Sequence, residues 1–150
     1  MGPQDTIDVE VHSAHAAIVT LRGEHDLSSR PQITVALAVA RGCGNVLVDL
    51  TGATFIDSSV INALLHSTNV LVREGARLEV VVPPDCYSMR SLFEILSVTR
   101  LLAMHDTRDA GIASISLAAP PSITVPGLRI RALVHEIDVS LAEVEARRVA

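Results

Sequence analysis

The stretch 46-VLVDLTGATFIDSSVINALL-65 changes from one kind of local structure to another within a few residues. Its first part, 46-VLVDL-50, is apolar and β-branched, which is typical of a strand buried on both faces of a parallel sheet. From Ser58 onward apolar residues recur at helical spacing, so we expect a helix that runs to about Glu74. The junction between them is 57-DSS-59, one carboxyl and two hydroxyl groups.

The same alternation of strands and helices extends over the first 117 residues. Further strands are expected at 7–13, 16–23, 77–83 and 101–105, and further helices from Pro31 to about Ala40, around Met89 to Leu96, and at 107–117. The first two strands predict a hairpin, and the later connections are long enough for right-handed crossovers between parallel strands. The pattern therefore indicates an α/β fold.

The composition changes after residue 117. The segment 118-AAPPSITVPG-127 contains three prolines and a glycine, which is typical of a linker. Farther along, Ser140-Leu-Ala-Glu143 has the spacing of a capping box and predicts a short helix from about 140 to 148. We therefore assign residues 1–117 to one domain and 118–150 to a C-terminal extension.

The composition also disfavours several classes of function. A net charge of −5 argues against a nucleic-acid-binding surface, because affinity there rests on neutralising phosphates. The basic residues are all arginine, which excludes a lysine Schiff base and a P-loop lysine. Cys43 and Cys86 have no metal-binding or redox spacing, so we expect free, packed thiols and no metal site.

The sequence predicts neither a membrane span nor a secretion signal. No apolar run approaches the roughly 20 residues needed to cross a bilayer. The first ten residues, MGPQDTIDVE, lack the basic start and apolar stretch of a signal peptide. A cytoplasmic protein without membrane contact is therefore expected.

The group 57-DSS-59 has three interpretations. The simplest is helix capping, since Asp and Ser side chains accept the free N–H groups of a first helical turn, each worth about 1 kcal/mol. On local physics alone capping is favoured over any specific function.

Catalysis by a serine is the second interpretation, and it has little support. The G-x-S-x-G elbow is absent, and His66 lies too far along the same helix to act as a local base for Ser58. The other histidines are scattered and are expected mostly at the surface; they are His12, His15, His25, His105 and His135. We therefore do not expect an enzyme.

A phosphorylation switch is the third interpretation. A phosphoserine adds about −1.5 to −2 charges, which a helix N-terminus tolerates because of its free N–H groups and dipole. The fold would survive, and a partner bound at this surface would detect the change. Capping and switching are compatible with each other.

The residues of this junction resemble the signature of STAS domains, typified by bacterial anti-sigma factor antagonists. In 46–65 an apolar strand ending in Asp-Leu leads through a short loop to a phenylalanine and then to Asp-Ser-Ser. The segment 23-GEHD-26 resembles the acidic turn after the family's second strand, and 92-LFEILSVTRLLAMHD-106 resembles its closing helix and last strand. The resemblance covers about residues 5 to 117.

The resemblance implies the SpoIIAA-like fold, a mixed, mostly parallel sheet of four to five strands with helices mainly on one face. It also implies a binding role without a cofactor. Ser58, or as second choice Ser59, would be phosphorylated by an anti-sigma factor with serine kinase activity, and a phosphatase would reset it. The unphosphorylated form would bind that anti-sigma factor and so regulate transcription. The partner-binding residues would be Glu24, Asp26, Asp57, Ser58, Ser59, Val60 and Asn62.

Two positions depart from the family pattern. Val60 replaces a common glycine, and its bulk is expected near the hydroxyl, where it would affect the kinase or the partner. His25 replaces an apolar residue. Two alternative functions remain open, a phosphorylation-independent STAS interaction module and a small-ligand sensor.

Overall fold

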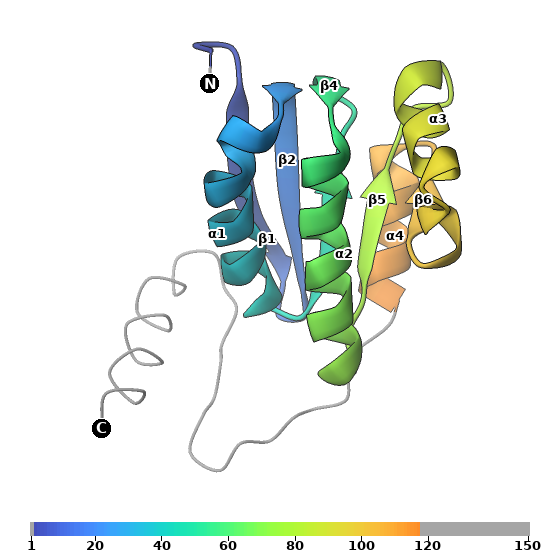
Figure 1. Cartoon of the computed structure of the whole chain (residues 1–150). Helices are drawn as coiled ribbons and strands as arrows, with labels where there is room; N and C mark the ends of the chain where they lie inside the picture. Colours follow the sequence, from blue (N-terminus) through green and yellow to red (C-terminus); the bar gives the residue numbers. More distant parts are fainter. Residues whose placement is uncertain (1, 118–150) are drawn as a thin grey trace.

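Strand β3 (Asn45–Asp49) lies at the centre of a mixed sheet in the computed structural model, which describes residues 2–117 (Figure 1). All five of its residues are buried, as expected for a central strand covered on both faces. The strand order is β1-β2-β3-β5-β6, and only the β1–β2 pair in that order is antiparallel. The other strands are β1 (Thr6–Ser13), β2 (Ala16–His25), β5 (Leu78–Val81) and β6 (Ala103–His105).

Helices cover both faces of this sheet, with most of them on one side. Helices α1 (Arg30–Arg41), α2 (Ser58–Arg73) and α3 (Tyr87–Ile95) contribute to the main hydrophobic core, whereas α4 (Arg108–Leu117) packs on the opposite face (Figure 1). None of the helices within residues 2–117 is long and apolar enough to span a membrane.

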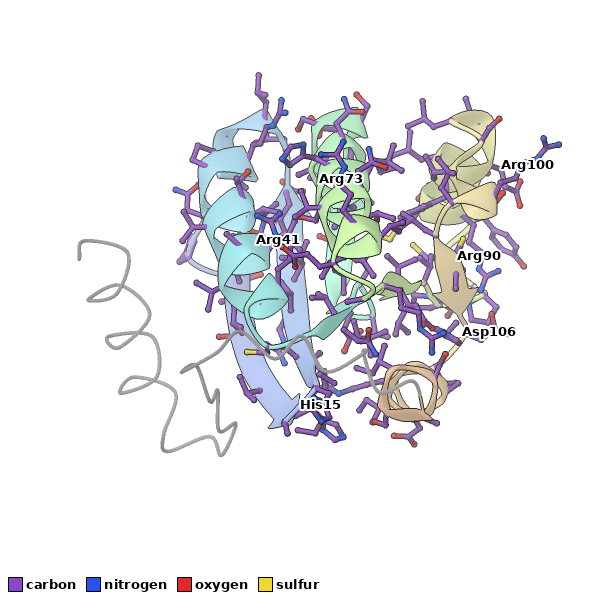
Figure 2. The ribbon with its side chains drawn as sticks, turned by 90° about the horizontal axis from the view of Figure 1, so that it is seen from below. His15, Arg41, Arg73, Arg90, Arg100 and Asp106 are labelled. Atoms are coloured by element: carbon purple, nitrogen blue, oxygen red, sulfur yellow. The ribbon has the colours of Figure 1, made fainter. Side chains whose placement is uncertain are left out.

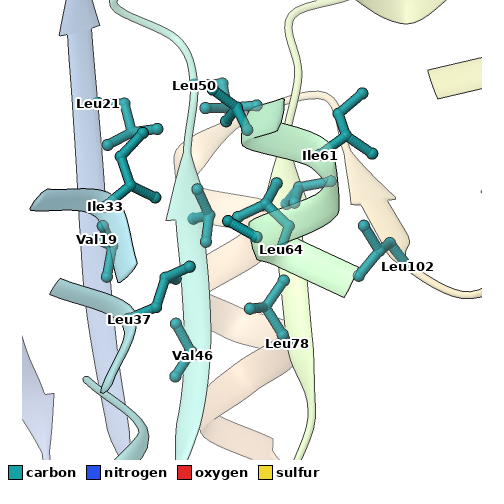
Figure 3. Packing of buried hydrophobic residues seen from close by; sticks show 14 of the residues in the cluster. Val19, Leu21, Ile33, Leu37, Val46, Leu50, Ile61, Leu64, Leu78 and Leu102 are labelled. Carbon is teal, nitrogen blue, oxygen red and sulfur yellow. The ribbon is translucent and has the colours of Figure 1, made fainter. Parts of the chain in front are cut away.

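The core follows the alternation of side chains along the strands. In β2, Val19 and Leu21 point into the main core, where Figure 3 shows them facing Ile33 and Leu37 of α1. The intervening Ile18 points the other way and belongs to the smaller cluster beneath α4. Because successive strand residues face opposite sides, the continuous apolar run of β2 requires helices on both faces.

Helix α4 is attached to the sheet by close packing and by ion pairs. A Cβ atom added at Gly111 would lie 2.7 Å from Leu47 Cδ1, so the glycine permits the close approach of helix and sheet. Arg108 Nη1 donates to the buried Asp49 Oδ2 at 2.7 Å. Burial alone would raise the pKa of Asp49, but hydrogen bonds from the Thr51 N–H and from Arg108 lower it below its ordinary value.

The expected α/β fold is confirmed, with two differences of detail. A short sixth strand, β4 (Ala53–Ile56), lies in the segment expected to be a loop, and it pairs in parallel with the end of β2. The last strand begins at Ala103 instead of Leu101, because residues Val98–Arg100 form a 3-10 turn. The predicted extension 118–150 and its helix at 140–148 lie outside the described residues.

Candidate functional site

Asp57 is the residue that caps helix α2. Its backbone is extended, and its side chain accepts hydrogen bonds from the backbone N–H groups of Ser59 at 2.9 Å and Val60 at 3.3 Å. The Ser59 hydroxyl donates to the same carboxylate oxygen, Oδ1, at 2.5 Å. One carboxylate therefore satisfies two of the free N–H groups of the first turn, a contribution of about 1 kcal/mol.

The two serine hydroxyls differ in their surroundings. Ser59 is half-buried and its hydroxyl is held by Asp57, whereas Ser58 is exposed as the first residue of the helix. Among residues 2–117, no group makes a hydrogen bond with the Ser58 hydroxyl. The geometry therefore leaves Ser58 as the hydroxyl that is accessible to another molecule.

A second turn of similar design lies beside the first. Asp26 follows β2 and caps the 3-10 turn Leu27–Ser29, where its Oδ1 accepts from the Ser28 hydroxyl at 2.6 Å and from the Ser28 N–H at 2.8 Å. The bond from the Ser28 hydroxyl, and after it the bond from the Ser28 N–H, lowers the pKa of Asp26 below its ordinary value. Since His25 pairs with Ile56, Asp26 and Asp57 leave adjacent strands at the same level.

Exposed carboxylates lie at the end of the molecule that carries these turns, together with Arg30 at the start of α1. Glu24 and Asp26 are exposed near the start of α2. Arg41 and Arg73, labelled in Figure 2, lie in the last turns of α1 and α2, where cations complement the helix dipoles. A partner at the Ser58 end therefore meets the exposed carboxylates of Glu24 and Asp26 and the exposed Arg30.

An apolar groove of about 330 Å³ opens directly beside Ser58. It lies between β4 and α3, and its lining residues are Thr54, Phe55, Ile56, Asp57, Ser58, Ser88, Met89 and Leu92. Phe55 is 50% exposed, which is unusual for a phenylalanine in a chain that has only two. In the sequence, the phenylalanine at the junction was one sign of this groove, but nothing indicated its second wall on α3.

The structure brings most of the predicted site residues together and removes one from the surface. Asp57, Ser58, Ser59 and Asn62 lie in the first turns of α2, and Ser58 and Asn62 are exposed. Val60, by contrast, has no exposed surface and packs in the main core. The expectation that Val60 contacts a partner or stands over the hydroxyl is therefore wrong, because the helix turns its side chain inward.

His25 also differs from expectation, since it is fully buried and not at the surface. Its Nε2 lies 2.8 Å from the carbonyl oxygen of Arg22, to which it donates, and no described group pairs with its buried Nδ1. His25 thus occupies the space of a core residue. His12, His15 and His66 are exposed, as expected.

Metal-binding side chains and reactive cysteines do not add a second chemical function to this site. Within the described ranges, no three His, Cys, Asp or Glu side chains gather as a metal site would require. Cys43 and Cys86 are free and half-buried, as expected. Burial raises the pKa of the Cys43 thiol, which disfavours the reactive thiolate.

Comparisons with known proteins agree on the fold. The family described as "Mlab, STAS domain" matches residues 9–103. A comparison with curated proteins gave no match.

Several solved structures are similar in fold. An anti-sigma factor antagonist from Mycobacterium paratuberculosis aligns with a TM-score of 0.66 and 21% identity, over 77% of this chain and 97% of its own. A putative anti-sigma factor antagonist from Thermotoga maritima gives 0.62 and 12%, over 73% and 94%. Bacillus SpoIIAA in its unphosphorylated form gives 0.59 and 19%, over 75% and 99%. At these identities the likeness shows a shared fold.

Proposed function

The chain belongs to the STAS domain family, and from this premise we propose that it is an anti-sigma factor antagonist switched by phosphorylation of Ser58. In the unphosphorylated state it binds an anti-sigma factor with serine kinase activity, and phosphorylation by that kinase ends the binding. The observation that carries this proposal is the exposed Ser58 hydroxyl, which lacks a hydrogen bond to any described residue.

The position of Ser58 explains how a phosphate would change binding without unfolding the domain. Asp57 already occupies the N–H groups of Ser59 and Val60. A phosphate on Ser58 would therefore stand outside the cap, in water, close to the positive end of the α2 dipole. The helix stays capped, while the surface gains about −1.5 to −2 charges next to a carboxylate.

The proposed partner-binding surface consists of the start of α2 and the neighbouring turn. Its exposed members are Glu24, Asp26, Ser58 and Asn62, with Asp57 half-buried between the two turns. Ser59 acts through its hydrogen bond to Asp57. A partner that packs on this surface would tolerate a small hydroxyl and would lose affinity when a dianion has to be desolvated.

In this proposal the protein acts by binding. The nucleotide is bound by the kinase, so the antagonist itself requires no cofactor, and a phosphatase restores the hydroxyl. The binding takes place in the cytoplasm, where it releases the sigma factor for transcription.

The test combines mass spectrometry with binding measurements. The full chain is incubated with kinase-type anti-sigma factors and ATP, and the phosphate is located by peptide mapping; we expect it on Ser58. Wild type and Ser58→Ala should capture the anti-sigma factor, whereas Ser58→Asp should not. Ser91→Asp, which adds the same charge at an exposed site on α3, serves as the control and should bind like wild type.

Two results would contradict the switch. They are an unmodified Ser58 after incubation with these kinases, and equal capture by wild type and Ser58→Asp. The second result would favour a phosphorylation-independent interaction module of the same fold.

A further inference from the structure

The size and the lining of the groove between β4 and α3 indicate what kind of group could occupy it. Four of its lining residues are apolar, Phe55, Ile56, Met89 and Leu92, and most of the surface that it exposes is apolar. Its volume of about 330 Å³ is at the lower end of the range of about 300–1,000 Å³ for small-molecule sites. It suits one or two apolar side chains better than a nucleotide or a lipid.

The charges around the groove also favour an apolar occupant. Asp57 is the single charged residue of the lining, and its Oδ1 already accepts three hydrogen bonds within the α2 cap. The lining contains no arginine or histidine, so it offers no counter-charge to an anionic ligand. An uncharged, apolar group is therefore the best complement.

The groove is continuous with the serine of the proposed switch, because Ser58 itself lines it. We propose that the groove is the anchor pocket of the partner interface and receives one apolar side chain, such as Leu, Ile, Met or Phe, from the partner protein. The identity of the partner in this inference rests on the proposed function. The apolar character of the side chain that enters the groove rests on the groove alone.

The arrangement gives the switch a physical mechanism. An apolar side chain seated in the groove would lie against Ser58, which lines it, and would exclude water from that residue. A hydroxyl tolerates this, but a phosphate dianion would lose its hydration without gaining a cation. Phosphorylation therefore acts on the anchor itself and need not move the backbone.

Two serines on α3 provide a matched pair of variants. Ser88 and Ser91 are both exposed, and only Ser88 lines the groove. Ser88→Trp should fill the groove, whereas Ser91→Trp adds the same bulk outside it. Thermal unfolding followed by circular dichroism checks that both variants fold.

The experiment uses random peptides displayed on phage as the probe and the immobilised full chain as the target. We expect selected peptides to share an apolar anchor, and to lose affinity about tenfold or more for Ser88→Trp but not for Ser91→Trp. Failure to select an apolar anchor, or equal affinity for both tryptophan variants, would overturn the proposal.

Other occupants of the groove are distinguished by crosslinking. With p-benzoylphenylalanine in place of Ser88 and no peptide present, a crosslink to residues 118–150 would identify the chain's own extension as the occupant. A crosslinked dimer would identify a second copy. Either product overturns the proposal of a partner side chain, and an uncrosslinked monomer supports it.

The same peptides separate this proposal from the switch at Ser58. If they require the groove but bind Ser58→Asp as tightly as wild type, the anchor pocket stands and the switch fails. If a kinase modifies Ser58 while binding ignores Ser88→Trp, the switch stands and the anchor pocket fails.

Discussion

His25 of β2 and Ile56 of β4 are direct partners in a parallel ladder, and each is followed by an aspartate that caps the next helical turn. In both turns the serine two residues beyond the aspartate donates its hydroxyl to the carboxylate. The residue between them differs, being Leu27 in one turn and Ser58 in the other. Within residues 2–117, the Ser58 hydroxyl is therefore left without a hydrogen-bond partner.

The first prediction concerns how Asp57 selects between two serines. Asp57→Ala should destabilise the domain by about 1 kcal/mol through loss of the cap, and it frees the Ser59 hydroxyl. We expect the kinase then to modify Ser59 as well as Ser58. Urea unfolding gives the stability, and phosphopeptide mapping gives the sites.

The control for this prediction is Asp26→Ala, which removes the equivalent cap of the neighbouring turn. It should leave modification confined to Ser58. Modification that stays confined to Ser58 in Asp57→Ala would show that the Ser59 hydroxyl is protected by something other than Asp57.

Local signals made the strand-to-helix junction predictable, but the shape of the site depends on distant residues. The cap at Asp57 follows from residue type and the helical period alone. The sequence also contained the information that the Val60 side chain points inward, because Leu64 lies one turn farther along the same buried face of the helix. The groove could not be predicted from the sequence, since residues 54–58 and 88–92, which line it, are far apart in the chain.

The second prediction concerns His25, which fills core volume and leaves Nδ1 unpaired among the described residues. His25→Leu should change stability by no more than about 1 kcal/mol, because the lost bond to Arg22 is offset by removal of an unpaired buried nitrogen. His25→Ala should cost about 2–4 kcal/mol through the cavity it leaves. Urea unfolding of both variants measures the difference.

The contrary result would be equally informative. If His25→Leu destabilises the domain as much as His25→Ala, the imidazole contributes through its polar atoms and not through its volume. The exposed His66→Leu is the control and should stay within about 0.5 kcal/mol of wild type.

The order of strands and helices could be predicted from the sequence because β2 and β3 contain long apolar runs. Such runs in β2 and β3 require cover on both faces, which α4 supplies on the second face. The short strand β4 could not be predicted in this way, since it has only four residues, one of them threonine, and directly follows a glycine. Its pairing with β2 joins residues about 30 positions apart, which local sequence patterns do not reveal.

The third prediction compares two arginine–aspartate pairs that differ in burial. Arg108→Met leaves the buried Asp49 without its cation and should cost about 2–3 kcal/mol, less than for a fully buried pair because Arg108 is 35% exposed. Arg22→Met breaks the exposed pair with Asp8 and should cost less than about 1 kcal/mol. Urea unfolding at neutral pH compares them.

The same variants predict a pH dependence through Asp49. Its pKa in the folded protein is below the ordinary value, so its contribution to stability is present above the ordinary value and is lost as the pH falls through the folded one. In Arg108→Met burial acts with less opposition and raises the pKa of Asp49. Acid unfolding should therefore begin at higher pH in Arg108→Met than in Arg22→Met, and equal midpoints would contradict the assignment.

The fourth prediction concerns the contact of α4 with the sheet at Gly111. A Cβ atom there would lie 2.7 Å from Leu47 Cδ1 and 2.9 Å from Val81 Cγ2, and both side chains are fully buried. Gly111→Ala should therefore destabilise the domain by about 1–3 kcal/mol through overpacking. The higher helix propensity of alanine offsets up to about 1 kcal/mol of this loss.

The reverse change at Ala113, which is exposed on the same helix, isolates the effect of helix propensity. Ala113→Gly should destabilise the domain by about 1 kcal/mol. Adding this loss to the loss measured for Gly111→Ala gives the free-energy cost of overpacking at position 111. If Gly111→Ala instead stabilises the domain, α4 must be able to move away from β3 without losing its ion pair between Arg108 and Asp49. Hydrogen exchange of the α4 amides would show that movement directly, because a displaced helix exchanges faster than one packed on the sheet.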